Sequence, residues 1–324
     1  PVPQSVALSV PLINSIGLGK SIDLKKIVKC FPSSPVISVR SSPVSAEWGG
    51  PSTILNIGMN NEVEKVYSGV LGSKAARELH IKFIKSFAIE VMRLDDEIFD
   101  HINITPEVAI DAYEQEIAEC FPRTIEAQLS EVLKSMSRAW QGTSARLLRA
   151  SKGVTDNAGL GLVVQRMVFG LGKGESGAGV IQFVESDTGI KREVGRYLSQ
   201  SQGRDALVDK KAAIFLTKDE RGPSLEDTQP DIFNELIKAG VNCSKGLKEE
   251  MQIEFTLQNG KLFILDAIPT LRNALAAVEV VTALVKEKII SKKEALLRID
   301  PKSLSDLLHQ QVVPGSIRGI ISKG

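Results

Sequence analysis

Residues 251–268 carry the pattern that most constrains the fold of this chain. In MQIEFTLQNGKLFILDAI, two runs of alternating apolar and polar residues flank Asn259-Gly260, a dipeptide typical of tight hairpin turns. Four apolar residues of the first run share one face: Met251, Ile253, Phe255 and Leu257. The pattern therefore predicts an antiparallel hairpin with one face in an apolar core and one polar face.

The polar face of this hairpin is the first candidate site. If Gly260 takes the left-handed position of a three-residue loop, Gln252, Glu254 and Asp266 share that face. A row of oxygen-bearing side chains suits a hard cation or a phosphate-bound metal. The alternative is a half-exposed hairpin whose polar face only contacts solvent, and the pattern by itself favours that alternative.

Length and charge bound the class of protein. A chain of 324 residues exceeds the usual size of a single core, so we expect two or three substructures. Forty basic residues against 39 acidic ones exclude a strongly basic nucleic-acid surface and a polybasic membrane surface. No apolar run approaches the roughly 20 residues that a membrane span requires. The opening PVPQSVALSV lacks the basic region of a signal peptide, and we expect the natural chain to extend upstream of it.

Cysteine and histidine are sparse. The three cysteines are far apart and form no CxxC pair, which indicates reduced thiols in the cytoplasm or an organelle interior: Cys30, Cys120 and Cys243. The three histidines are too scattered for a zinc site or a histidine-based catalytic set: His80, His101 and His309. We therefore expect neither a zinc site nor catalysis by a histidine of this chain.

The order of patterns predicts a mixed α and β chain. The predicted strands lie at 5–10, 35–40, 53–57, 160–169, 179–184, 190–198 and 212–216, besides the hairpin. The predicted helices lie at 22–28, within 62–150, and at 230–239, 273–286 and 291–298. Ser291 and Glu294 form a capping box at the start of the last of these.

Two glycine motifs imitate nucleotide-binding loops. Gly19-Lys20-Ser21 ends like a P-loop, but Asn14 stands where the first glycine is required. Gly172-Lys-Gly174-Glu-Ser-Gly177 spells GxGxxG, yet a strand pattern follows it, whereas the dinucleotide motif opens a helix. We interpret the second motif as a glycine-rich hairpin. Neither motif is interpreted as a nucleotide-binding fingerprint.

Arg40 is more informative about function than these two glycine motifs. It ends a short strand pattern and precedes a loop rich in Ser, Gly and Pro. Arginine presents a planar fork of donors that matches phosphate. By itself, Arg40 fits a surface or ion-pairing role equally well.

Six segments resemble, in the same order, the nucleotide domain of the pyruvate phosphate dikinase family. They are SVRSSPVSAEWGGPSTILNIG (38–58), VVQRMVFG (163–170), SGAGV (176–180), GRYLSQSQGRD (195–205), IEFTLQNGKLFIL (253–265) and SLSDLLH (303–309). The run VPGSIRG (313–319) is similar to the start of that family's next domain. The resemblance extends over nearly the whole chain.

The resemblance implies an ATP-grasp-like fold of the α+β or α/β class, in which two lobes clamp ATP and Mg²⁺. We expect a first lobe of 1–60 plus about 123–170, a helical insertion of 61–122, a second lobe of 171–290, and a helical tail of 291–324. The family's nucleotide domain phosphorylates a histidine on a separate swivelling domain. Partners are therefore expected to be other domains or subunits of a larger assembly, together with a nucleotide.

The resemblance also assigns roles to residues. Arg40 matches the phosphate-binding arginine and Glu254 the metal-binding glutamate, while Gln202, Gly203 and Asp205 match the nucleotide pocket. Several positions depart from the family. On the hairpin, Gln252 replaces an aspartate, Asp266 replaces a glutamine and Ile268 replaces an arginine. Elsewhere, Arg196 and Arg204 replace acidic residues, and Gly49-Gly50-Pro51-Ser52 replaces a glycine, two methionines and an aspartate. The segment with the family's phosphate lysine would precede Pro1.

These departures affect positions that place charge, on which phosphoryl transfer depends. Our leading interpretation is a nucleotide-binding module with impaired catalysis, acting as a binding or scaffold unit. The alternative is an active phosphotransferase in which Asp266 binds magnesium and Arg196 or Arg204 replaces the lost arginine. A third interpretation is a sensor that binds ATP or ADP without chemistry.

Overall fold

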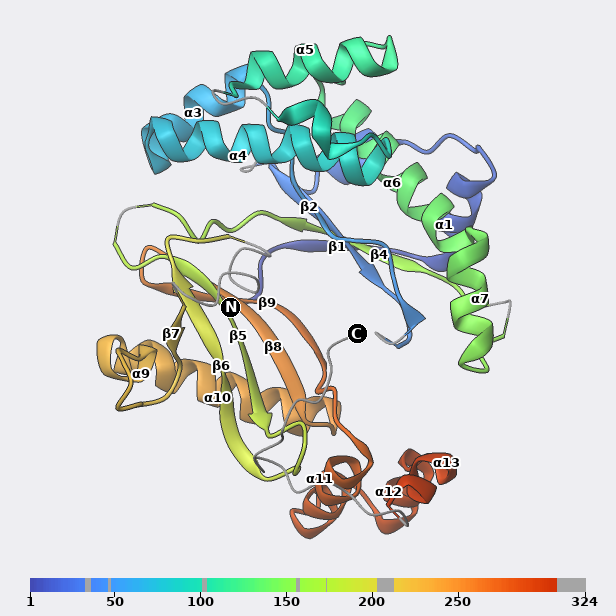
Figure 1. Ribbon diagram of the computed structural model, residues 1–324, viewed down its shortest axis with the longest axis vertical. Helices are drawn as coiled ribbons and strands as arrows, with labels where there is room; N and C mark the ends of the chain where they lie inside the picture. Colours follow the sequence, from blue (N-terminus) through green and yellow to red (C-terminus); the bar gives the residue numbers. More distant parts are fainter. Residues whose placement is uncertain are drawn as a thin grey trace, which may run out of the picture. The chain divides into compact units, whose positions relative to one another are not determined.

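A computed structural model of the chain describes residues 1–32, 36–45, 48–100, 104–155, 158–172, 174–202 and 213–307. The chain divides into two compact units, Pro1–Ser176 and Gly177–Gly324 (Figure 1). Each unit combines an antiparallel sheet with helices, which confirms the predicted mixed class. The ATP-grasp arrangement and the finer division into lobes stay predictions.

The sheet of the first unit has four strands in the order β1-β4-β2-β3 (Figure 1). Their bounds are β1 Ser5–Leu8, β2 Ile37–Ser42, β3 Ile54–Ile57 and β4 Gly161–Arg166. One face of this sheet belongs to the apolar core, because Val39 on β2 and Val164 on β4 are directly paired and fully buried.

Helices supply the rest of this core. They are α1 Val10–Gly17, α2 Leu24–Val28, α3 Asn61–Leu71, α4 Ser73–Ser86, α5 Pro106–Ile117, α6 Ile125–Gln141 and α7 Thr143–Ser151, with a π-helical turn at Phe87–Val91 and a 3₁₀ turn at Asp96–Phe99. Thr105 caps α5 as predicted, since its hydroxyl accepts the N–H of Val108 at 3.3 Å. Among the described residues, no helix combines the length and apolar character needed to cross a membrane.

Helix α1 corrects the prediction of a strand over 5–10. The strand ends at Leu8, and Ser9 takes the N-cap position of a helix with Pro11 in its first turn. Gly19-Lys20-Ser21 therefore follows the end of a helix. A P-loop would instead join a strand to the start of a helix, so the rejection of that motif holds.

The second unit has a five-stranded sheet in the order β7-β6-β5-β8-β9 (Figure 1). Its strands are β5 Gly177–Val184, β6 Lys191–Ser199, β7 Ile214–Phe215, β8 Met251–Gln258 and β9 Lys261–Pro269. Its helices are α9 Leu225–Thr228, α10 Pro230–Leu247, α11 Ala274–Lys286, α12 Lys292–Arg298 and α13 Pro301–Asp306. The capping box of Ser291 and Glu294 is present at α12.

Helix α10 packs on one face of this sheet. Leu236 of α10 belongs to the same buried cluster as Ile181 of β5 and Ile253 and Phe255 of β8. On that face, the rings of Tyr197 and Phe255 stack with centroids 6.1 Å apart. Between them lies Gly179, the cross-strand partner of both residues.

The β8–β9 hairpin forms as predicted, but through a different turn. Gln258 pairs directly with Lys261, so the loop has only two residues, Asn259 and Gly260, with φ values of 51° and 74°. The extra residue needed to bring Asp266 opposite Glu254 is a β-bulge at Leu265. The predicted pairing is right, whereas the three-residue loop is wrong.

Substitution of Gly179 tests how tightly the stacked aromatic face is packed. A Cβ atom there would lie 2.5 Å from the Phe255 ring and 2.7 Å from the Arg196 carbonyl oxygen. We expect Gly179→Ala to lower the free energy of unfolding by about 1–3 kcal/mol, measured by denaturant titration. Gly246→Ala on α10 is the control, because its Cβ meets nothing within 4 Å and it should stabilise by about 0.5–1 kcal/mol. Equal effects of the two substitutions would contradict this account.

We expect the buried carboxyl of Glu250 to make the free energy of unfolding depend on pH. Burial raises the pKa of its carboxyl above the usual 4.5, opposed by Lys191 at 3.6 Å. The folded state thus holds this proton more tightly than the unfolded state, so the stabilisation is complete below pH 4.5 and is lost as the pH rises through the folded pKa. We expect Glu250→Gln to unfold at higher denaturant concentration than the parent at pH 7, with the difference shrinking near pH 4. A difference independent of pH would show that Glu250 does not carry the effect.

Candidate functional site

One row of side chains crosses the sheet of the second unit on the face opposite α10. Glu254 on β8 pairs directly with Asp266 on β9 and with Val180 on β5, and Val180 pairs with Arg196 on β6. Residues directly opposite each other project from the same face, with Cβ atoms about 4.5–5.5 Å apart. The row therefore places one guanidinium and two carboxylates across four neighbouring strands.

The flanking rows carry no charge. Towards the β5–β6 turn, the next row consists of Val194, Gln182, Gln252 and Ile268. On the other side it consists of Leu198, Ala178, Thr256 and Phe263. Within these three rows, the charged groups are thus confined to the middle one.

The first unit also has a polar sheet face. Arg40 and Ser38 alternate with the core residue Val39 along β2, so they lie on the face away from the apolar core. Ser38 pairs with Gln165, whose amide donates to the Ser5 hydroxyl at 3.2 Å. Arg40 is only 8% exposed. A buried guanidinium beside hydroxyl and amide groups is suited to an anionic ligand.

The structure brings together some of the predicted residues. Glu254 and Asp266 are cross-strand partners, Glu254 half-buried and Asp266 exposed, whereas Arg40 belongs to the other unit. Gln202 is buried, three residues beyond the end of β6. Gly203 and Asp205, together with Arg204, lie outside the described residues.

The carboxylate pair fits one kind of metal site. Among the described residues, no group of three or more His, Cys, Asp and Glu side chains is placed to hold a metal ion. Two carboxylates do not make an all-protein cage. They suit Mg²⁺, which proteins commonly hold through one or two carboxylates while substrate phosphates supply further oxygens.

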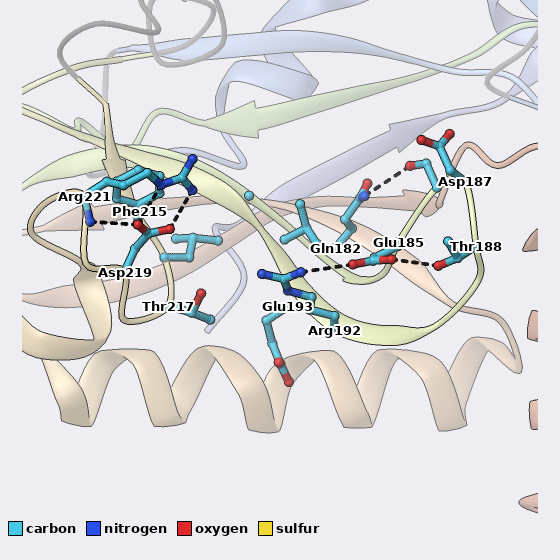
Figure 2. Close-up of a pocket in the computed structure, with 14 residues that line it drawn as sticks. Gln182, Glu185, Asp187, Thr188, Arg192, Glu193, Phe215, Thr217, Asp219 and Arg221 are labelled. Carbon is cyan, nitrogen blue, oxygen red and sulfur yellow. Dashed lines mark hydrogen bonds and ion pairs between the residues drawn. The ribbon is translucent and has the colours of Figure 1, made fainter. Parts of the chain in front are cut away.

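Sequence reasoning missed a pocket of about 580 Å³ near the turn between β5 and β6 (Figure 2). Two ion pairs line it: Arg192 lies 3.2 Å from Glu185, and Arg221 donates two hydrogen bonds of 2.8 and 2.6 Å to Asp219. The Arg221 guanidinium holds the pKa of Asp219 at about 2. No local motif marks this pocket, because it joins a strand turn to a segment some thirty residues later.

Fold and site together define a mixed α/β chain with a polar, charge-bearing sheet face in each unit. No protein-family model matches it. The pyruvate, phosphate dikinase of Rickettsia prowazekii is 30% identical over 310 residues, which are 89% of this chain and 35% of that protein. The enzyme of Rhizobium meliloti is 29% identical over 89% of this chain and 35% of its own length. The chloroplastic enzyme of Flaveria trinervia is 28% identical over 86% of this chain and 31% of its own.

The chain is similar to pyruvate, phosphate dikinases along most of its own length. It spans about a third of the length of these curated relatives. The solved structure of C-terminally truncated Cdc123 from Schizosaccharomyces pombe aligns with 83% of this chain and 78% of its own, at a TM-score of 0.34 and 11% identity. A likeness this low supports no argument about the fold.

Proposed function

We propose that this chain is a pyruvate phosphate dikinase-like nucleotide-binding unit of the ATP-grasp type, with impaired phosphoryl transfer. The observation that carries the proposal is the row of Arg196, Glu254 and Asp266. It offers separate places for an anion and for a metal ion on one sheet face. We further propose that the unit works as a binding or scaffold module in a larger assembly.

The proposed ligand is ATP with Mg²⁺. Glu254 and Asp266 are proposed to hold the metal, and Arg40 is proposed to bind phosphate. Gln202, Gly203 and Asp205 are proposed for the nucleotide pocket. When bound, the metal neutralises phosphate charge, and the side chains of this chain orient the polyphosphate.

We propose that phosphoryl transfer is impaired because of the residues in the row beside the carboxylates. There Ile268 faces Gln252 directly, at two positions where the family resemblance implies an arginine and an aspartate. An aliphatic side chain cannot stabilise a phosphate undergoing transfer, and an amide is a weaker magnesium ligand than a carboxylate. Losing one such electrostatic contact commonly lowers a rate by about two orders of magnitude, or roughly 3 kcal/mol.

One observation favours the alternative of an active, ATP-dependent phosphotransferase that phosphorylates a histidine on a separate domain. The Asp266 side chain is placed directly opposite Glu254 and so provides a second carboxylate. Arg196 provides a cation in the same row. In this alternative the chain would serve pyruvate and phosphoenolpyruvate interconversion.

We also propose the domain organisation implied by the resemblance. It comprises a first lobe of 1–60 with about 123–170, a helical insertion of 61–122, a second lobe of 171–290 and a tail of 291–324. The partners would be further domains or subunits, since the curated relatives are about three times as long as the matched region. The reduced state proposed for Cys30, Cys120 and Cys243 suits the cytoplasm or an organelle interior.

Calorimetric titration with ATP, with and without Mg²⁺, tests the proposed function. We expect binding that Mg²⁺ strengthens, and turnover far below the 1–100 s⁻¹ of ordinary kinases. Glu254→Gln should remove most of the strengthening by Mg²⁺, because it deletes a metal-binding carboxylate. The control is Glu193→Gln on β6, which lies at the register shift beyond Val194 and outside the row of Arg196, Glu254 and Asp266.

The possible outcomes separate the proposals. Turnover at a normal kinase rate with a histidine-bearing partner domain would establish the alternative and end the case for impairment. No binding of ATP with or without Mg²⁺ would refute a nucleotide-binding role altogether. Equal losses in Glu254→Gln and Glu193→Gln would show that the Glu254 face is not the metal site.

A further inference from the structure

A small cavity of the first unit has charged side chains that the proposed function does not use. Its volume is about 160 Å³, and it lies between the segment that leads into β3, the end of the helix that continues α4, and α6. Its apolar lining consists of Ile54, Val91 and Met136. Its polar lining includes Ser52, Glu90 and Arg93. The cavity therefore combines an apolar wall with one carboxylate, one guanidinium and one hydroxyl.

These three polar side chains are not engaged by the chain itself. Within the described part of the chain, Ser52, Glu90 and Arg93 take part in no ion pair and in no side-chain hydrogen bond. Glu90 is half-buried, whereas Arg93 is exposed. A partly desolvated carboxylate is costly without a hydrogen-bond donor. Two opposite charges that border one cavity and do not pair with each other leave room for a ligand between them.

The backbone that carries the two charges has an uncommon conformation. Helix α4 continues into the π-helical turn Phe87–Val91, which ends with an N–H that donates to a carbonyl oxygen five residues earlier, at 3.1 Å. Arg93 follows with a φ of 64°, in the left-handed region that favours glycine. The Ser135 hydroxyl on α6 donates to the Val91 carbonyl oxygen at 2.9 Å and so fixes the turn. Such turns and left-handed residues are concentrated at functional sites.

The volume and the charges select the class of ligand. An apolar cavity of about 150 Å³ holds benzene, which has about six non-hydrogen atoms, so a ligand of similar size fits here. An ammonium group matches the Glu90 carboxylate, and a carboxylate matches the planar donor fork of Arg93. A ligand with a single charge would leave one of the two side chains unpaired. A small α-amino acid carries both charges on neighbouring atoms, together with a short side chain for the apolar wall.

We propose that Ser52, Glu90 and Arg93 form a binding site for a small α-amino acid in its zwitterionic form. Glu90 accepts hydrogen bonds from the ammonium group, and Arg93 donates hydrogen bonds to the carboxylate. The Ser52 hydroxyl supplies a further polar contact at the same cavity. The site goes beyond the proposed nucleotide-binding function, because it uses neither Arg40 nor any residue of the second unit.

Titration of the full chain with L-alanine, propionate and ethylamine, followed by ligand-observed NMR, tests the class of ligand. Propionate lacks the ammonium group of alanine, and ethylamine lacks its carboxylate. We expect L-alanine to bind at least about tenfold more tightly than either analogue, because each analogue leaves one charged side chain unpaired. Binding of propionate as tight as that of L-alanine would overturn the inference, since it would indicate an anion contact only. Absence of L-alanine binding would overturn it as well.

Arg93→Gly separates binding from stability. The substitution deletes the guanidinium and places glycine at a left-handed position, so it should raise the denaturant midpoint. It should also weaken L-alanine binding at least about tenfold, because it deletes a charge-assisted contact. Glu90→Gln keeps the shape of the side chain and should abolish the preference for L-alanine over propionate. Parental affinity for L-alanine in Arg93→Gly, or parental preference in Glu90→Gln, would overturn the inference.

Lys288→Gly is the matched control. Lys288 is an exposed cation of the second unit with a φ of 61°, and it does not line the cavity. The substitution therefore removes one positive charge and relieves the same kind of backbone strain. It should raise the denaturant midpoint and leave the affinity for L-alanine unchanged. A similar loss of affinity in Arg93→Gly and Lys288→Gly would overturn the inference, because it would indicate only a general effect of positive charge.

Discussion

The candidate site of the second unit depends on one extra residue in β9. The side chains of a strand alternate between its two faces, so a shift of one residue exchanges them. The two-residue turn pairs Phe255 with Ile264 and, continued without interruption, would place Leu265 opposite Glu254. The bulge at Leu265 instead brings Asp266 onto the Glu254 face and keeps Ile264 on the α10 face. Without it, the second carboxylate would lie against the apolar core.

The apolar face holds the row in position. Stacked Tyr197 and Phe255, separated by Gly179, connect β6, β5 and β8 on the side of α10. These are the strands that carry Arg196, Val180 and Glu254 on the other side. A packed interior fixes the spacing of the strands, and the spacing fixes the distance between guanidinium and carboxylate. The glycine that admits the aromatic rings therefore also determines the geometry of the charged face.

Local patterns could predict part of this arrangement. Alternation in 251–268 is enough to place Glu254 on the polar face, and Ser291 with Glu294 is enough to begin α12. The bulge at Leu265 cannot be predicted from the sequence, because no turn residue or local pattern marks it. Helix α1 was missed because its apolar residues continue those of β1, although Ser9 and Pro11 mark its start. Predicting that Arg196 and Glu254 lie in one row requires knowledge of how strands more than fifty residues apart pair.

Binding and catalysis place unequal demands on such a row. Affinity for a metal-bound polyphosphate requires opposite charges at a suitable spacing, and we propose that Arg196 and the carboxylate pair meet that requirement. Transfer requires the reacting phosphate to be placed to within about 1 Å, and an error of that size costs about a hundredfold in rate. Arg196 lies two strands from Glu254 on the β5 side, whereas Ile268 lies on the adjacent β9. In the proposed site, a cation on β6 instead of β9 would draw the phosphate towards β5 by several ångströms. Under the proposed function, the same substitutions would preserve binding while abolishing transfer.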